Sequence, residues 1–143
     1  MSEYSLGHVH LKVQSLDRSI PFYTEIFELE ITERYDNYVF LSWGDHHHDI
    51  ALQATAEKPH GDPSTAGLYH AAIEVPQKSI LKRVYSRITD QNIRVTPVDH
   101  GISKALYFND PDGNGLEVYI DTRDENSTEQ WQGNSTYFDP ESL

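Results

Sequence analysis

The sequence predicts an α+β fold in which residues 1–143 form a single domain built from two tandem βαβββ modules. Two six-residue segments of alternating character, HVHLKV and HAAIEV, begin at His8 and His70. Each is followed by a stretch with apolar residues at helical spacing and then by three short strand-like runs. The same order of elements is therefore expected twice.

The first module is expected over residues 5–56, and its first strand over 8–13. A helix follows, because Leu16, Ile20, Tyr23 and Phe27 recur at helical spacing. Either Ser15 or Asp17 suits its N-cap, and a proline in the early turns is tolerated. The remaining strands of this module are expected at about 29–34, 37–43 and 49–54.

The second module is expected over residues 67–122, after a linker rich in proline and glycine at 57–66. Its first strand runs over 70–75. The apolar stripe Ile80, Leu81, Val84 and Ile88 predicts a helix that stops near 90–92. Its other strands are expected at about 93–96, 104–109 and 115–121. The polar tail 123–143 carries Trp131, Tyr137 and Phe138, which can attach it to the body.

Composition excludes several classes of function. The net charge of -12 disfavours nucleic acids and anionic membrane surfaces as partners. Without cysteine there is no disulfide framework, zinc ribbon or thiol nucleophile. No apolar run approaches the about 18 residues of a membrane span, and the first residues lack the layout of a secretory signal. We therefore expect a cytoplasmic protein.

Strand alternation places three metal-binding residue types on one kind of face. In the first strand, Leu11 and neighbouring apolar residues point one way and His8 points the other. The same rule puts His70 and Glu117 on the polar faces of their strands. Any one of these residues alone is more simply a packed histidine or a solvated charge. Two histidines at equivalent starts, with a late carboxylate, predict a 2-His-1-carboxylate site in a curved, half-barrel-like fold.

The residues also resemble a known family. HVHLKV followed by Ser19-Ile-Pro-Phe-Tyr23 is similar to the opening of glyoxalase/bleomycin-resistance/extradiol-dioxygenase proteins, the vicinal oxygen chelate superfamily. The resemblance covers nearly all of residues 6–121. The turn Asp-Pro-Asp-Gly-Asn before Glu117 is common to the whole superfamily. The narrower Asp99-His-Gly-Ile-Ser103 resembles type I extradiol ring-cleavage dioxygenases.

This resemblance implies roles for matching residues. His8, His70 and Glu117 match the three metal ligands, and the implied metal is Fe(II), with Mn(II) or another divalent ion also compatible. His100 matches a histidine that hydrogen-bonds a substrate oxygen, and Tyr107 a tyrosine that contacts the bound catecholate.

A sixth role is implied for His48, because the run His48-Asp-Ile-Ala-Leu52 resembles a strand whose histidine faces oxygen and acts as acid and base. Strict alternation would instead turn His47 and Asp49 inward, so His48 reaches the site only if the strand start is irregular. The three histidines 46–48 are alternatively a solvated turn.

The implied activity is cleavage of a catecholic ring with O2 by an extradiol-type dioxygenase, an oxidoreductase of aromatic compound catabolism. A glyoxalase-like lyase or isomerase is one alternative, but it needs a fourth protein ligand. Alignment of the two modules puts Ala51 there, and alanine cannot bind metal. Gln53 would fill the position if that alignment were shifted by two residues.

Two further alternatives remain. A fosfomycin-type transferase is the second choice among enzymes, because it shares the ligands, although Asp-His-Gly-Ile-Ser is not its pattern. It needs cations, for which Lys104 and Arg94 are candidates. A bleomycin-resistance-like protein would only sequester a ligand and has no need of the three metal ligands. Well-known extradiol enzymes usually have four such modules, whereas this chain has two. We therefore expect a homodimer in which a second subunit or the tail closes the pocket.

Overall fold

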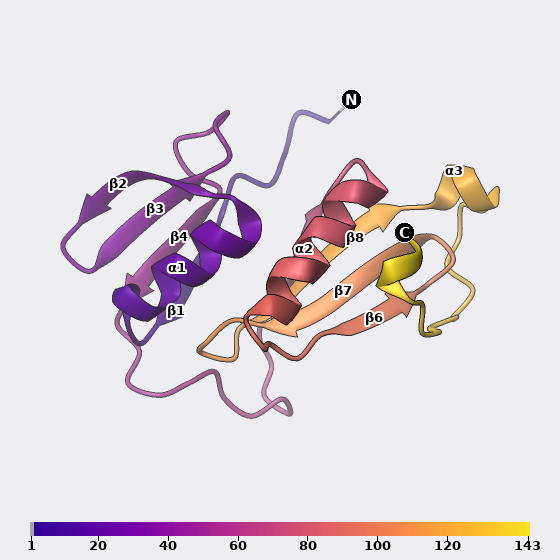
Figure 1. The fold of residues 1–143 in the computed structure, drawn as a ribbon. Coiled ribbons are helices and arrows are strands. Elements are labelled where there is room, and N and C mark those ends of the chain that lie inside the picture. Colours follow the sequence, from indigo (N-terminus) through magenta and orange to yellow (C-terminus); the bar gives the residue numbers. More distant parts are fainter. Residues whose placement is uncertain (1) are drawn as a thin grey trace. The chain divides into compact units, whose positions relative to one another are not determined.

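The computed structural model describes residues 2–143 and confirms the α+β prediction, with the order β-α-β-β-β occurring twice (Figure 1). The first series is β1 (Val9–Val13), α1 (Leu16–Phe27), β2 (Glu30–Tyr35), β3 (Tyr38–Ser42) and β4 (Ile50–Ala54). The second is β5 (Ala71–Glu74), α2 (Lys78–Asp90), β6 (Thr96–Asp99), β7 (Ser103–Asn109) and β8 (Gly115–Asp121). A short α3 (Arg123–Asn126) and a final 3-10 turn (Pro140–Ser142) follow.

Each series forms its own four-stranded mixed sheet. The strand orders are β1-β4-β3-β2 and β5-β8-β7-β6, so the two sheets have the same topology. In each, the first strand pairs in parallel with the last, and the other pairs are antiparallel. The histidine-led strands β1 and β5 are thus edge strands of their sheets.

The chain divides into two compact units that correspond to the two sheets. The first contains the chain up to Thr65 together with Pro111–Asn114, and the second contains Ala66–Asp110 and Gly115–Leu143. The module and linker bounds inferred from the sequence stay a prediction. In the described part of the chain, residues 2–143, every helix is too short or too polar to cross a membrane.

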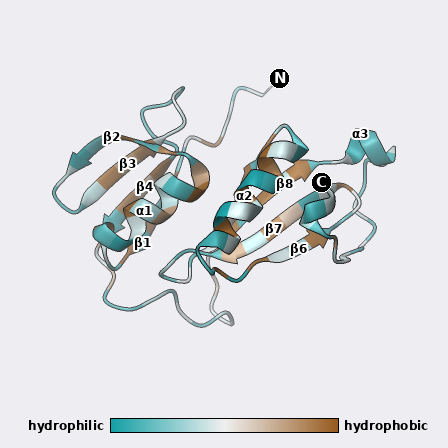
Figure 2. Cartoon of the chain, in the orientation of Figure 1, coloured by the Kyte–Doolittle hydropathy of each residue, from teal (hydrophilic) through white to brown (hydrophobic). Residues whose placement is uncertain are grey.

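Helix α1 contributes several side chains to the core of the first unit. Ser15 is its N-cap, and the Ser15 hydroxyl accepts a hydrogen bond from the Arg18 backbone N–H at 3.3 Å. The helix packs against β3 and β4, and its Tyr23 and Ile26 are fully buried. Each such burial contributes about 1.5–3 kcal/mol. In the second unit, α2 packs on β8 in the same manner. Figure 2 shows apolar residues along the central strands and a hydrophilic α3.

The segment Pro111–Asn114 is held in the first unit through a buried carboxylate. Asp112 is 1% exposed. Its Oδ1 accepts hydrogen bonds from the Gln14 backbone N–H at 3.0 Å and from Arg18 Nη2 at 2.7 Å. The second aspartate of the Asp-Pro-Asp-Gly-Asn motif therefore has a structural role, because it caps the chain between β1 and α1.

One strand boundary differs from the sequence prediction. The strand expected at 93–96 is β6, and it lies three residues later. Helix α2 closes through Asn92, which has a φ of 57°, and the Ile93 N–H donates to the Ile88 carbonyl at 3.2 Å. Because of this helix ending, β6 begins only at Thr96. Pro97 is accommodated because β6 is an edge strand.

Candidate functional site

His8, the predicted metal ligand of the first unit, is exposed beside a strand whose side chains alternate between buried and exposed. Leu11 and Val13 are buried, whereas His8, His10 and Lys12 are exposed. This is the expected consequence of the two-residue repeat of a strand. His8 lies immediately before β1, which begins at Val9.

His48 lies beside His8, with their ring centroids 4.4 Å apart. His48 comes before β4 begins at Ile50, in a turn whose Trp43 backbone N–H donates to Asp49 Oδ2 at 2.9 Å. The irregular strand start that His48 required is therefore present, since alternation does not govern a turn. Burial, followed by the nearby His8, lowers the pKa of His48 below its ordinary value.

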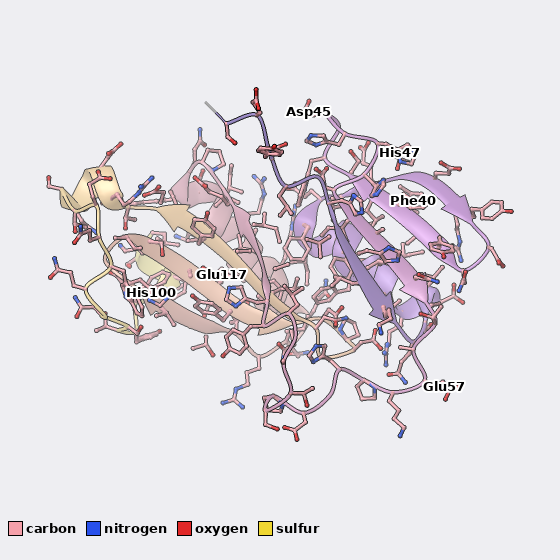
Figure 3. All side chains as sticks on the ribbon, turned by 180° about the vertical axis from the view of Figure 1, so that it is seen from behind. Phe40, Asp45, His47, Glu57, His100 and Glu117 are labelled. Carbon is pink, nitrogen blue, oxygen red and sulfur yellow. The ribbon has the colours of Figure 1, made fainter. Side chains whose placement is uncertain are left out.

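The other two histidines of this turn are bound to carboxylates. The His46 Nδ1 lies 3.1 Å from Asp49 Oδ1, and the His47 Nε2 lies 3.0 Å from Glu33 Oε1. Both side chains are more than half exposed, at 61% and 56%. His47 also lies against Phe40 (Figure 3). The alternative of a solvated turn thus describes His46 and His47 better than it describes His48.

The strand register shows which residue of the first sheet corresponds to Glu117. Ala51 pairs with His10, two residues after His8, and Glu117 pairs with Ala72, two residues after His70. Ala51 therefore occupies the position of Glu117, and no shift brings Gln53 there. The first sheet offers no carboxylate at this point.

In the second unit, His70 and Glu117 meet directly. The His70 Nε2 lies 2.9 Å from Glu117 Oε1. Glu117 is only 8% exposed, an unusual environment for a carboxylate that carries a charge. An imidazole and a carboxylate converging in this way form a donor pair that divalent ions such as Fe(II), Mn(II) and Zn(II) accept. These donor types suit a metal ion, and the pair supplies two of the three donors that the sequence predicts.

Gly115 makes this approach possible. A Cβ at position 115 would lie 2.4 Å from the Tyr69 carbonyl oxygen and 3.2 Å from His70 Cβ. Only glycine lets the start of β8 run this close to the segment that carries His70. Sequence reasoning missed this role, although the glycine two residues before Glu117 was the available signal.

Tyr107 lies opposite Glu117 in the register of β7 and β8. Burial, and then the charge and hydrogen bond of Glu117, raise the pKa of Tyr107 to about 12. The hydroxyl therefore stays protonated at neutral pH. It also lies 2.8 Å from His100 Nε2. The second unit thus brings together His70, Glu117, Tyr107 and His100, and Figure 3 labels Glu117 and His100.

The predicted six residues are thus distributed as four in the second unit and two, His8 and His48, in the first. Among residues 2–143, no three His, Asp or Glu side chains are gathered into a group ready to hold a cation. The complete three-ligand set stays a prediction, while the His70–Glu117 pair is an observed contact.

A family model decides the relationship. Residues 5–118 match the Glyoxalase/Bleomycin resistance protein/Dioxygenase superfamily. The chain belongs to this superfamily. The vicinal oxygen chelate fold expected from the sequence is therefore confirmed, as a pair of mixed sheets with few helices.

Curated relatives within the superfamily include dioxygenases. The chain is 32% identical over 120 residues to catechol-2,3-dioxygenase of Bacillus subtilis (strain 168), which covers 81% of this chain and 41% of that protein. It is 31% identical over 133 residues to biphenyl-2,3-diol 1,2-dioxygenase 3 of Rhodococcus globerulus, covering 90% of this chain and 70% of that one. The chain therefore spans less than half of the Bacillus relative.

The fold also matches solved structures. A glyoxylase/bleomycin resistance protein/dioxygenase domain from Frankia sp. EAN1pec superposes with a TM-score of 0.72 at 24% identity, covering 84% of this chain and 93% of that one. Similarity extends to glutathione transferase FosA of Serratia marcescens, at 24% identity over 81% of this chain and 80% of that protein. The proteins that resemble this chain in sequence therefore carry names of more than one enzyme activity.

Proposed function

We propose that this vicinal oxygen chelate protein is a metal-dependent, extradiol-type dioxygenase that cleaves a catecholic ring. The observation that carries the proposal is the continuous set of His70, Glu117, Tyr107 and His100 in the second unit. It combines metal donors with two groups able to hydrogen-bond a phenolic oxygen. The two dioxygenases at 31–32% identity support the same reaction class.

His8, His70 and Glu117 are the proposed ligands, and Fe(II) is the proposed metal. When bound, such an ion supplies Lewis acidity and an electron path between a catechol and O2. Both atoms of O2 enter one ring-opened product, so the reaction needs no external reductant. Three protein ligands would leave coordination positions open for the substrates. Ala51 has no donor atom and therefore supplies no fourth ligand.

The other residues have proton and positioning roles in this proposal. Tyr107 keeps its hydroxyl proton at neutral pH and can donate a hydrogen bond to a catecholate oxygen. His100, hydrogen-bonded to Tyr107, shares that task. His48 has a lowered pKa and is neutral at physiological pH, so its imidazole can take up and return a proton during the reaction.

One observation disfavours the lyase, and another removes Lys104 as the cation of a transferase. A lyase of the glyoxalase type would need a fourth ligand where Ala51 stands. A phosphonate-binding transferase would need a cation beside Tyr107. Lys104, however, lies on the opposite face of β7, where its Nζ is 5.7 Å from the centroid of the Phe138 ring.

The homodimer expected from the sequence stays a proposal.

The test is oxygen uptake by the full chain after anaerobic loading with Fe(II). A small panel of monocyclic and biaryl catechols is supplied, and absorbance is followed for the yellow ring-opened product. We expect one mole of O2 consumed per mole of product. His70→Ala should abolish both signals, because it removes a metal donor.

His60→Ala is the matched control, because His60 is exposed and lies outside the proposed site. It should leave uptake unchanged. Metal binding that depends on His70 but supports no uptake with any catechol would contradict the dioxygenase proposal. Weight would then move to another chelate-binding role on this fold.

A further inference from the structure

Trp131 is an exposed tryptophan that the polar tail nevertheless holds in one orientation. The residue is 56% exposed, but its Nε1–H donates to the Asn134 carbonyl at 2.8 Å. The same carbonyl oxygen lies 3.2 Å from His100 Nδ1, and Ser135 Oγ lies 3.2 Å from that nitrogen. The segment that fixes the indole is therefore the one that contacts His100.

The segment that carries Trp131 is attached at both ends to the turn after β6. Before it, the Asn126 side-chain amide donates to the Gly101 carbonyl at 2.7 Å. After it, the backbones of Asp99 and Thr136 bond reciprocally, with N–O distances of 2.6 and 3.0 Å. Attachment on both sides keeps the indole beside this turn. Ordering the ring when a ligand binds therefore costs little conformational entropy.

Trp131 ends a row of aromatic rings that begins at the proposed metal donors. Ring centroids are 5.7 Å apart for His70 and Tyr107, and 6.0 Å apart for Tyr107 and His100. The Trp131 ring lies edge-on to His100, again at 6.0 Å. Tyr69 lies against His70 at the donor end of the row. Because a catechol turns its two oxygens toward the donors, a substituent on its ring can point toward Trp131.

The surroundings favour an uncharged aromatic substituent over a cationic one. The face of an indole attracts both kinds of group. A cation would gain further from a free carboxylate, but Asp99 Oδ1 accepts from the Gly101 N–H at 2.8 Å. The Glu129 carboxylate lies 3.6 Å from the Arg123 guanidinium. These two carboxylates are the closest in sequence to the two rings, and both are engaged, whereas an aryl group needs no such partner.

We propose that Trp131 is a specificity-determining residue, whose exposed indole packs against an aryl substituent of a catechol bound beside His100. The inference rests on the proposed function, because that function places the catechol at the donor end of the row. It narrows the substrate class to catechols that carry a second aromatic ring. Aromatic packing of this kind changes affinity by about threefold to tenfold.

Binding can be followed without turnover in the full chain loaded with Zn(II), a diamagnetic ion that accepts the same donors. The probes are catechol and 3-phenylcatechol, both kept anaerobic. The chain has two tryptophans, so Trp43→Phe identifies the indole signals of Trp131. We expect nuclear Overhauser contacts between the phenyl protons and the Trp131 indole. Trp43, whose Nε1–H donates to the Phe27 carbonyl in the first unit, should show none.

Isothermal titration measures the contribution of this contact to affinity. The original chain should bind 3-phenylcatechol more tightly than catechol. Trp131→Ala should reduce that preference about threefold to tenfold by weakening the phenyl compound alone, because the metal donors and His100 still hold a catechol. Trp131→Phe keeps an aromatic ring and should retain most of the preference. Trp43→Phe, at a tryptophan 47% exposed, is the matched control and should retain all of it.

Three outcomes would each overturn the proposal: an unchanged preference in Trp131→Ala, an equal loss of affinity for both diols, or saturation by 3-phenylcatechol without an Overhauser contact to Trp131. A Trp131-dependent preference for dopamine, whose side chain is cationic, over 3-phenylcatechol would do the same. Failure to bind either diol would overturn it together with the proposed site. Because no O2 is supplied, absence of oxygen uptake in the dioxygenase test leaves a Trp131-dependent preference standing.

Discussion

Ala51 and Glu117 occupy the same register position in two sheets of identical topology, and only one of them can bind a metal. The residue that pairs with this position on the neighbouring antiparallel strand is also apolar in the first sheet and polar in the second. Phe40 lies opposite Ala51, and Tyr107 lies opposite Glu117. The two sheets therefore share one topology but carry different side chains at these two positions. Glu117 becomes the most informative position to change.

Glu117→Gln should weaken metal binding while the fold is retained. The amide has nearly the same shape but lacks the charge that a divalent ion needs. Changes to groups that only support ligands cost about 10- to 100-fold in affinity, so loss of a ligand should cost at least about 100-fold. Isothermal titration with Mn(II) measures it.

Glu74→Gln is the control for this variant, since Glu74 is an exposed carboxylate on the adjacent β5 that accepts a hydrogen bond from Tyr119. Its affinity for Mn(II) should match that of the original chain. Equal Mn(II) affinity in Glu117→Gln and the original chain would remove Glu117 from the ligand set.

Gly115→Ala should destabilise the second unit and displace His70. The added methyl would meet the Tyr69 carbonyl oxygen at 2.4 Å, so the backbone must move. Overpacking of this kind costs about 1–3 kcal/mol. Urea denaturation gives the free energy of unfolding. Gly67→Ala, at a glycine with open space around it, is the comparison and should stay within about 0.5 kcal/mol of the original chain.

Alternation predicted that His8, His70 and Glu117 lie opposite the apolar faces of their strands. The contact between His70 and Glu117 is consistent with this expectation, and the set of three ligands stays a prediction. His48 required more, because its position depends on a turn before β4 that alternation does not describe. The contacts of Ser135 with His100 lie beyond any local pattern, since they join residues far apart in an irregular tail. The displaced β6 shows the same limit, because the αL conformation of Asn92 set its start.

Asp112→Ala should lower the stability of the first unit. The carboxylate is buried and accepts from the Gln14 backbone and from Arg18, so its removal leaves donors without an acceptor. Losing a charged hydrogen bond of this type costs about 1.5–3 kcal/mol. Thermal and urea unfolding would show the loss. Asp17→Asn, at a side chain 95% exposed, should have almost no effect. Equal losses in the two variants would refute a special role for Asp112.

His48→Gln should reduce turnover with catechol by about 10²- to 10⁴-fold, the usual worth of a positioned acid–base group. Affinity for Mn(II) should not change, since glutamine replaces a neutral side chain that is not a proposed ligand. Steady-state oxygen uptake and titration separate the two effects. His46→Gln lies in the same turn but contacts Asp49, and it should keep full turnover. Full turnover in His48→Gln would assign the acid–base role elsewhere.

The tail reaches His100 partly through the carbonyl of Asn134, a group that every amino acid carries. Substitution at position 134 therefore leaves this acceptor in place, so the identity of the side chain there matters little for the contact with His100. A one-residue insertion or deletion between α3 and Thr136 would instead move a different carbonyl to the ring. Among relatives, the spacing of the tail should be a better guide to a retained His100 environment than the identity of its residues.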